Sequence, residues 1–542
     1  MKKIQRHQYL NNEHGIVLVV VMILVAVSIL IGTSSIFTSG IGLKISGNSR
    51  LGTQAFYASE AGAEFAFSRL KNALRVINPI ITDESPTIIG YAFDECSITS
   101  LGMQAQEETT GTYAGLTAFI TQYRITSKAH VNGTNATAET SLLVKDNLIP
   151  IFQFGIFYDG NLEILPGSNM TFSGGRIHSN SNIYMNADGG TLSIDAMITS
   201  AGNIIHGHLD SRSHSTTNTV RIKDGNDDYQ TMNIDSNSAN WASEALETWD
   251  GNVKDKAHGC TSLTLPTSTG SGAARDLTGT GSDSLYAKSG LRIINGTAYD
   301  KDLNVIDITY TSGGATVNPI STKSFTDKRE GKVVTVTEID IAKLQNSTTA
   351  MNALNNPPPG CDPGILYVNQ TNNTKSVRLT NGATIPSTGL TVVSNNPVYI
   401  KGNYNEANNP SAILGDAVTF LSNNWNDSNS SQDLSYRSAG NTTVNAAIMA
   451  GNVPTPGGTS TYSGGVENFP RFLENWTGKT FTYGGSIVCL WESNQATGPW
   501  SYGSYYTAPN RIWSYGINPA NLPPGTPKFR LVEKLAWHHN IF

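Results

Sequence analysis

An unbroken apolar segment near the amino terminus is the feature that most constrains how this chain can fold. Sixteen consecutive residues, Ile16 to Ile31, carry no charge and include a single serine. As a helix this segment is roughly 24 Å long, slightly short of a bilayer core of about 30 Å, and continuing it to Phe37 makes the span adequate. The preceding sequence, MKKIQRHQYLNNEHG, is polar and basic, so we expect it to stay cytoplasmic while the rest of the chain faces outward.

Two alternatives share this layout: a secretory signal peptide that is removed, and a plain signal anchor. The apolar core of a signal peptide is usually about 7–15 residues long and precedes a cleavage site of the A-x-A type. Here the apolar run is longer and no clear A-x-A site follows it. The sequence therefore predicts a membrane helix that remains in the mature protein.

The helical pattern continues beyond the apolar run. No proline occurs before Pro79, and small and apolar residues recur at helical spacing between positions 51 and 73. Glu60 and Glu64 are four residues apart, as expected on a solvated face. A helix from Ile16 to about Val76 would be roughly 90 Å long, with an apolar first half and a more polar, water-compatible second half. One use for such a helix is to pack as a central stave in a filament.

The leader and the helix together resemble a known family. A short basic leader that ends in glycine directly before an apolar run is similar to the signal of type IV pilins. The segments GIVLVVVMILVAVSIL and GNSRLGTQAFYASEAGAE resemble the N-terminal segment of PilX-like minor pilins, and the resemblance covers about residues 1–75. It implies that a prepilin peptidase removes the leader, residues 1–15, by cutting between Gly15 and Ile16. It also implies partners: other minor and major pilins, an inner-membrane assembly platform and a PilY-type tip adhesin.

One position departs from the pattern of major pilins. Those proteins carry a glutamate at the fifth position of the mature chain, which here is Val20. A carboxylate in hydrocarbon is costly unless it is paired, and in the family it is thought to pair with the amino terminus of a neighbouring subunit. A subunit with no neighbour ahead of it needs no such carboxylate. The K-type pseudopilins of type II secretion resemble this chain at the same position and also lack the glutamate. Val20 therefore favours a position at or near the filament tip, or one that initiates the filament, over a repeat in the shaft.

Beyond the helix the pattern changes to strands. Two alternating segments flank the turn Asn132-Gly133, which predicts an antiparallel β-hairpin over 117–144. A long helix packed on such a hairpin is the pilin plan. We therefore expect residues 16–150 to form a pilin-like module.

From residue 151 onward short segments repeat. Residues 176–184 align with residues 197–205 at an offset of 21 positions, and three later segments resemble them. Units of about twenty residues predict a β-solenoid-like body (a parallel β-helix) over 151–463, with an ordinary β-sandwich as the alternative. We expect a large insertion at about 210–380 and an aromatic-rich C-terminal cap over 464–542. The expected fold class is α+β, mainly β.

Four cysteines lie far apart in the sequence and form no CxxC pair: Cys96, Cys260, Cys361 and Cys489. They allow up to two disulfides, and a bond between Cys260 and Cys361 would tie the ends of the insertion. Isolated buried thiols are the alternative.

Charge and motifs argue against an enzyme or a nucleic-acid-binding protein. Only 14% of residues are charged, the formal net charge is −6, and no basic stripe is present, so we expect no nucleic-acid partner. No P-loop, GxSxG or HExxH motif occurs, and no paired Cys/His metal spacing. We therefore expect no catalysis, cofactor or metal site.

The sequence thus predicts a minor-pilin-like subunit of a type IV pilus, at or near the tip, with a role in assembly, adhesion or motility. Before assembly a single span would hold it in the inner membrane, and afterwards it would lie on the cell surface. Two alternatives stay open: a membrane-anchored cell-envelope β-helix adhesin without a filament, and a polysaccharide-active β-helix enzyme. A cluster of carboxylates in one groove of the body would favour the enzyme.

Overall fold

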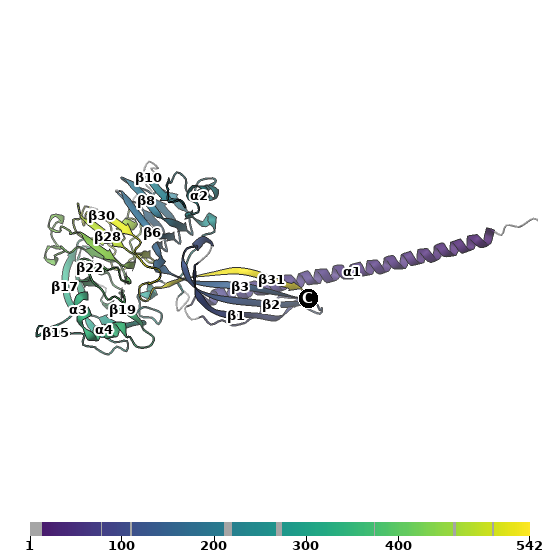
Figure 1. Ribbon diagram of the computed structural model, residues 1–542, viewed down its shortest axis with the longest axis horizontal. Coiled ribbons are helices and arrows are strands. Elements are labelled where there is room, and N and C mark those ends of the chain that lie inside the picture. Colours follow the sequence, from purple (N-terminus) through teal and green to yellow (C-terminus); the bar gives the residue numbers. More distant parts are fainter. Residues whose placement is uncertain are drawn as a thin grey trace, which may run out of the picture.

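The structure is a computed structural model with three parts in line: a bare helix, a stalk and a head (Figure 1). The bare helix is the first half of α1 (Glu13–Ala73), and the stalk is the second half of α1 with a four-stranded sheet. The head is formed by residues between 151 and 527. The structure describes residues 13–76, 79–108, 111–167, 169–210, 219–266, 274–372, 374–458, 462–500 and 503–541.

Helix α1 confirms the predicted long helix, with slightly different bounds. It runs unbroken over 61 residues, roughly 90 Å, and ends at Ala73 rather than Val76. Proline is absent from this stretch, so nothing interrupts the backbone hydrogen bonds. The leader residues 1–12 lie outside the described part of the chain.

The stalk sheet is antiparallel, with the strand order β1-β2-β3-β31. Strands β2 and β3 are the predicted hairpin, and Gly133 in its turn has a φ of +75°, which glycine adopts without strain. The hairpin accounts for only the two central strands, because β1 and the C-terminal strand β31 extend the sheet on either side. The four strands are β1 (Tyr91–Glu108), β2 (Thr117–Val131), β3 (Thr137–Pro150) and β31 (Lys528–Ile541).

The head is built on one long path of strands, almost all parallel to their neighbours. In spatial order the path is β11 (Tyr229–Thr231), β10 (Thr219–Lys223), β8 (Thr191–Ser200), β6 (Met170–Ser179), β4 (Phe154–Tyr158), β29 (Ile487–Cys489), β26 (Ala447–Ala450), β23 (Ser411–Gly415), β21 (Leu390–Val393), β19 (Asp362–Asn369), β13 (Ser289–Ile294) and β14 (Thr297–Tyr299). Four further strands join this sheet off the path: β12 (Val253–Lys254), β25 (Thr442–Asn445), β28 (Thr480–Gly484) and β30 (Asn510–Ser514).

Two smaller sheets accompany the long path, and the chain alternates between them and the path. The first contains β5 (Leu162–Ile164), β7 (Ile183–Met185) and β9 (Ile204–His206); the second contains β17 (Ile320–Asp327), β18 (Lys332–Asp340), β20 (Lys375–Thr380), β22 (Val398–Lys401), β24 (Val418–Leu421) and β27 (Arg471–Phe472). A separate hairpin, β15 (Tyr310–Ser312) with β16 (Ala315–Val317), projects from the head (Figure 1).

The repeat found in the sequence corresponds to strand pairing. Ile177 pairs with Ile198, and Ile183 pairs with Ile204, so the two aligned segments lie side by side at an offset of 21 residues. Their isoleucines belong to the largest buried cluster of the head. Stacking identical positions buries each apolar residue against its equivalent in the next strand. The assignment of the whole body as a solenoid stays a prediction.

The order of strands along the path corrects two expectations. The chain enters the path in the middle at β4 and builds outward to β10, then reappears at the far end as β13 and returns to β29, beside β4. The insertion expected at about 210–380 is therefore too long, because β13, β18, β19 and β20 within it are regular sheet strands. The cap expected over 464–542 is wrong: β29 lies in the middle of the path and β31 returns to the stalk.

Short helices, rather than the C-terminal segment, pack near the ends of the path. Helix α2 (Trp241–Trp249) lies beside β12 and buries both of its tryptophans. At the other end α3 (Ile341–Asn346) contacts β18, and α4 (Thr348–Asn355) contacts β13 and β19. Their apolar residues join the same core as the strands, which removes those strand ends from water.

Candidate filament interface

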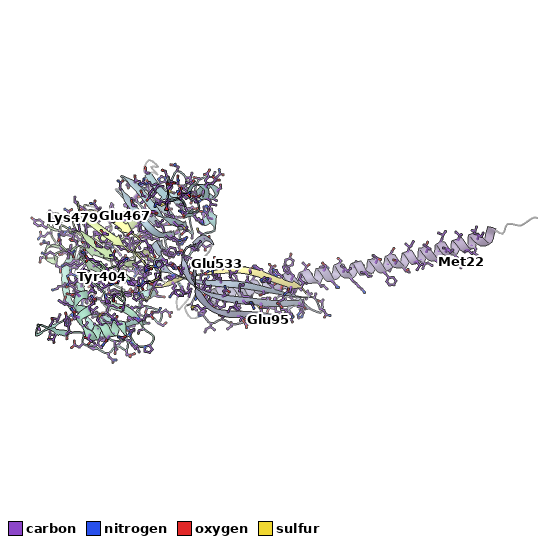
Figure 2. All side chains as sticks on the ribbon, viewed as in Figure 1. Met22, Glu95, Tyr404, Glu467, Lys479 and Glu533 are labelled. Atoms are coloured by element: carbon purple, nitrogen blue, oxygen red, sulfur yellow. The ribbon has the colours of Figure 1, made fainter. Side chains whose placement is uncertain are left out.

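The first half of α1 presents apolar side chains that nothing in the chain covers. Val20 is 48% exposed, Phe37 is 72% exposed, and the large apolar residues between Ile16 and Ile45 are all exposed. Figure 2 shows these side chains, Met22 among them, standing clear of the stalk and head. Within the described residues, α1 is the one helix long and apolar enough to cross a membrane. An apolar surface of this extent needs either hydrocarbon or other protein around it.

Small residues let the second half of α1 approach the stalk sheet closely. Ala55, Ala63 and Ala66 are almost fully buried, at the helical spacing noted in the sequence. A Cβ added at Gly62 would lie 2.2 Å from Ser127 Oγ and 2.6 Å from Phe93 Cε1, so the helix is pressed against β1 and β2 there. The small residues of the segment AFYASEAGAE, apart from the exposed Ala61, therefore have a packing role.

A buried chain of hydroxyl groups joins the helix to the two strands beneath it. Ser59 Oγ and Thr140 Oγ1 are 2.7 Å apart, and both side chains are fully buried. Thr140 Oγ1 lies 3.1 Å from Nδ1 of His539 on β31. The His539 ring also packs edge-on against Phe56 of α1, with centroids 4.8 Å apart. One polar network thus connects α1, β3 and β31.

The two glutamates predicted on a solvated face of the helix lie at the edge of this contact. Glu64 is half-exposed and forms an ion pair with Lys534 of β31. The Lys534 ammonium also lies 4.6 Å from the centroid of the Phe67 ring. An exposed pair of this kind contributes at most about 1 kcal/mol, so it orients the helix more than it anchors it. Glu60, one turn earlier, is half-buried.

The C-terminal end of α1 is held by Arg530 of β31. Its guanidinium donates to the carbonyl of Val76 at 2.9 Å, and also to the carbonyl of Leu74. Both carbonyls lie just past the last helical residue, Ala73, where a cation is favourable because it faces the negative end of the helix dipole. Arg530 Nε lies 3.0 Å from Oδ1 of Asp146, a buried carboxylate on β3. Burial raises the pKa of Asp146 to about 6, and the Arg530 charge opposes that rise.

Sequence reasoning identified the helix side of this contact but missed Asp146, Arg530, Lys534 and His539. Asp146 and Arg530 are separated by the entire head, and no local pattern links them. The predicted cleavage residues Gly15 and Ile16 both lie within α1, and Ile16 is 69% exposed. Cleavage between them stays a prediction.

The cysteines lie far apart, and all four are free thiols. The bond expected between Cys260 and Cys361 is not formed, because Cys260 lies near the end of β8 whereas the Cys361 thiol contacts the first residue of β13. Eight strand spacings separate β8 from β13, roughly 38 Å, and a disulfide needs Cα atoms within about 7 Å. The alternative of isolated buried thiols describes Cys96, Cys260 and Cys489. Burial raises the pKa of Cys260 to about 11 and that of Cys489 to about 12.

Carboxylates line a cavity of about 400 Å³ beside β4 and β29, which bears on the alternative of a polysaccharide-active enzyme. They belong to Asp159, Glu163 and Glu492. Glu163 is buried and uses both oxygens: one accepts from the Leu209 amide at 3.1 Å and the other from the Thr455 hydroxyl at 2.9 Å. Burial raises the pKa of Glu163. These hydrogen bonds tie two loops to β5, so the Glu163 carboxylate has a structural role in holding the loops.

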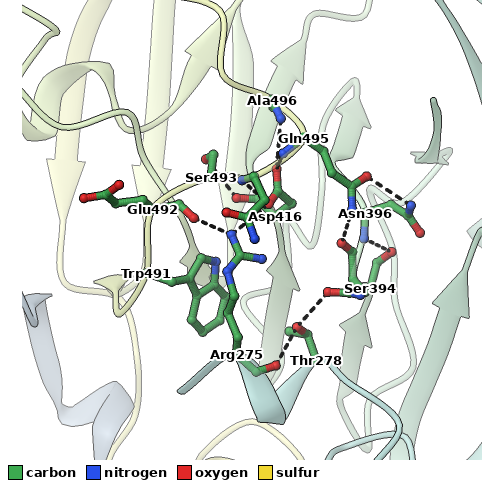
Figure 3. Close-up of polar contacts among 12 residues, drawn as sticks. Arg275, Thr278, Ser394, Asn396, Asp416, Trp491, Glu492, Ser493, Gln495 and Ala496 are labelled. Carbon is green, nitrogen blue, oxygen red and sulfur yellow. Dashed lines mark hydrogen bonds and ion pairs between the residues drawn. The ribbon is translucent and has the colours of Figure 1, made fainter. Parts of the chain in front are cut away.

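A second buried carboxylate fastens two loops of the head (Figure 3). Asp416 accepts from three successive backbone amides, of residues 494, 495 and 496, at 2.7–3.0 Å. It also accepts from the Arg275 guanidinium at 3.0 Å, and Arg275 lies against the Trp491 ring. Asp416 therefore joins the loop after β29 to a segment that precedes β13.

One Ser/Asp/His group in the head has the wrong order for nucleophilic catalysis. Asp255 lies between its partners: it accepts from the Ser236 hydroxyl at 2.7 Å and lies 2.9 Å from His258 Nδ1. Activation of a serine requires the histidine between the serine and the acid. The other histidine nitrogen faces the Ala242 carbonyl. The group caps a short helical turn instead.

A helix that is bare and apolar at one end and packed on an antiparallel sheet at the other has the architecture expected of a pilin-like module. The comparison with protein families agrees. Residues 14–64 match the family described as PilX N-terminal. The N-terminal segment is thus PilX-like, as the sequence predicted, and the match ends before the head begins.

Among solved structures, the chain is similar to the crystal structure of the competence-associated pilin ComZ from Thermus thermophilus. The two share 12% sequence identity over 91% of this chain and 98% of that chain, with a TM-score of 0.27. No curated protein matches the chain. The likeness to the PilX family therefore depends on the N-terminal segment.

Proposed function

We propose that this chain is a minor-pilin-like subunit at or near the tip of a type IV pilus, where it helps assembly begin and presents its head for adhesion or motility. Prepilin peptidase would cut between Gly15 and Ile16. The apolar half of α1 would hold the subunit in the inner membrane and then pack with other pilins, with the assembly platform and a PilY-type adhesin as further partners. The observation that carries the proposal is the bare apolar half of α1.

The size of the head supports a position at the tip. The 377 residues from 151 to 527 form a compact body roughly 50 Å across, from the usual scaling of size with length. Packed helices lie only about 8–10 Å apart. Subunits repeated at that spacing along a shaft would bring their heads into collision, whereas a subunit at the end has free space ahead of it.

Val20 supports the same position for an electrostatic reason. It is half-exposed on the bare helix and offers no charge to the amino terminus of a subunit ahead of it. A subunit inside the shaft would leave that terminus buried without a partner, which is costly in hydrocarbon. At the tip no such terminus exists.

We also propose that the subunit acts without catalysis. The family matched by residues 14–64 is a pilin family. The carboxylate that is most buried in the head cavity is already engaged by loop-fastening hydrogen bonds. Adhesion through the surface of the head is sufficient for the proposed role.

Mass spectrometry of the mature amino terminus in sheared filaments tests this function. A peptide that starts at Ile16, present at far lower abundance than the major pilin, is the expected result. Gly15→Val should keep the leader and stay in the membrane fraction. Gly32→Val is the matched control for cleavage and should still lose the leader, because it lies beyond the cleavage site and its added Cβ meets nothing within 4 Å in the chain itself. A wild-type protein that retains residues 1–15, or is cleaved but absent from filaments, would overturn the proposal and favour the anchored adhesin.

A further inference from the structure

The last strand of the chain completes the surface on which α1 sits. Strand β31 pairs with β3 from Ala138 opposite Ile541 to Pro150 opposite Lys528. Its end lies beside α1 at the point where the helix leaves the stalk (Figure 1). At that point the Ile541 side chain lies 3.3 Å from where a Cβ at Gly52 would be.

The same strand contacts the helix along the whole docked half. Lys534 pairs with Glu64 near the middle, and Arg530 binds the carbonyl of Val76 at the end. Trp537 packs into the apolar cluster that contains Ala63, Ala66 and Leu70 of the helix. Without β31, the helix would lose one of the strands beneath it and the cation that caps its last turn.

The folded head brings β31 to this place. The Ile151 amide, at the start of the head, donates to the carbonyl of Pro527, at its end, at 3.0 Å. The Tyr515 hydroxyl donates to the carbonyl of Phe152, also at 3.0 Å. The two tethers of the head are thus held side by side, although 377 residues separate β3 from β31. In an unfolded head, closing so long a loop would reduce their encounter by a factor on the order of 10³–10⁴.

We propose that β31 makes the seating of α1 conditional on a complete, folded head. A chain that is truncated, or whose head is unfolded, lacks Arg530, Lys534 and Trp537 at the helix and leaves Asp146 buried without its counter-charge. Such a chain cannot hold α1 in the geometry of the finished subunit. The coupling itself follows from the stalk contacts; its consequence, that incomplete subunits stay out of the filament, rests on the proposed function.

Hydrogen exchange on the full chain in detergent, titrated with urea, tests the coupling. Amides of residues 55–70 in α1 are expected to lose protection at the same urea concentration as amides of β21 and β23 in the head. Trp476→Ala, which removes a fully buried side chain of the head, should shift both midpoints together. If residues 55–70 stay protected after the head has opened, the proposal is wrong. The wild-type titration decides the matter even where the variant fails to fold.

Two single substitutions on β31 distinguish loss of the contact between β31 and α1 from unfolding of the head. Trp537→Ala should raise exchange of residues 55–70 roughly tenfold or more while β21 and β23 stay protected. Leu535→Ala, on the same strand at a 48% exposed position, should change neither. Equal effects of the two substitutions on α1 would contradict the proposal. In cells, Trp537→Ala should be absent from filaments; if the wild type is also absent, the proposed function fails while the exchange result stands.

Discussion

Replacing Arg530 by methionine should destabilise the stalk strongly at pH 7.5 and much less at pH 5. Methionine keeps the apolar length of the side chain but removes the charge beside Asp146, whose carboxylate is 2% exposed. A buried charge left without its partner would cost about 3–5 kcal/mol if it stayed ionised. Asp146 can take up a proton instead, and with a pKa of about 6 this limits the loss at pH 7.5 to about 2 kcal/mol. The variant also loses the cap on the carbonyls of Leu74 and Val76, which is worth about 1 kcal/mol at any pH.

The pH dependence follows from the titration of Asp146. Its folded pKa of about 6 lies above the unfolded value of about 3.9, so the folded state binds the proton more tightly. The free energy of unfolding therefore rises as the pH falls from about 6 to about 4, by up to about 3 kcal/mol in the wild type. Removing Arg530 raises this pKa further. At pH 5 the carboxyl is mostly protonated in both proteins, so only the lost cap of about 1 kcal/mol should remain.

Hydrogen exchange of peptides from β3, measured in urea at pH 7.5 and pH 5, reports the loss of stalk stability in the Arg530 variant at each pH. Arg124→Met is the matched control, because Arg124 lies exposed in the neighbouring strand β2 and should cost little at either pH. Adding Asp146→Asn to the Arg530 variant should remove the pH dependence. A loss of stability at pH 5 that equals or exceeds the loss at pH 7.5 would refute the reasoning.

Three further predictions concern packing, the head and the thiols. Gly62→Val should lower the free energy of unfolding of the stalk by about 1–3 kcal/mol in urea titrations, while Gly47→Val, where an added Cβ meets nothing within 4 Å, should not. Asp416→Asn should cost about 2–4 kcal/mol and speed proteolysis of the 491–496 loop, unlike the exposed Asp276→Asn; unchanged cleavage would contradict the assigned contacts. Mass spectrometry after alkylation in denaturant should find four free thiols, and in the native protein at pH 8 Cys489 should react slowly because burial raises its pKa; a disulfide would contradict the structure.

Elements whose pattern is local could be predicted from the sequence. The helix followed from the apolar run and the absence of proline, and the β2–β3 hairpin followed from alternation around Asn132-Gly133. The 21-residue offset between two similar segments predicted their pairing, because equivalent positions of stacked strands bury one another. Each of these signals lies within a short stretch of chain.

Pairings between distant segments could not be predicted in the same way. The sequence of β31 belongs to an aromatic-rich C-terminal segment, and no pattern within it indicates that β3 is its neighbour in the sheet. The position of β29 beside β4, which closes the long path, is equally non-local. The ion pair between Asp146 and Arg530 depends on both strands. Sequence reasoning therefore identified the helix of the interface but not the strand β31 residues that hold it.

Imaging of sheared filaments labelled on the head tests the central claim most directly. Gold-conjugated antibody against residues 151–527, applied to wild-type filaments and to those of a deletion strain as control, should mark one end of a filament and leave the shaft bare. Label spaced regularly along the shaft would contradict the tip position. Label confined to cell envelopes, with filaments unmarked, would contradict the role of α1 as a filament helix.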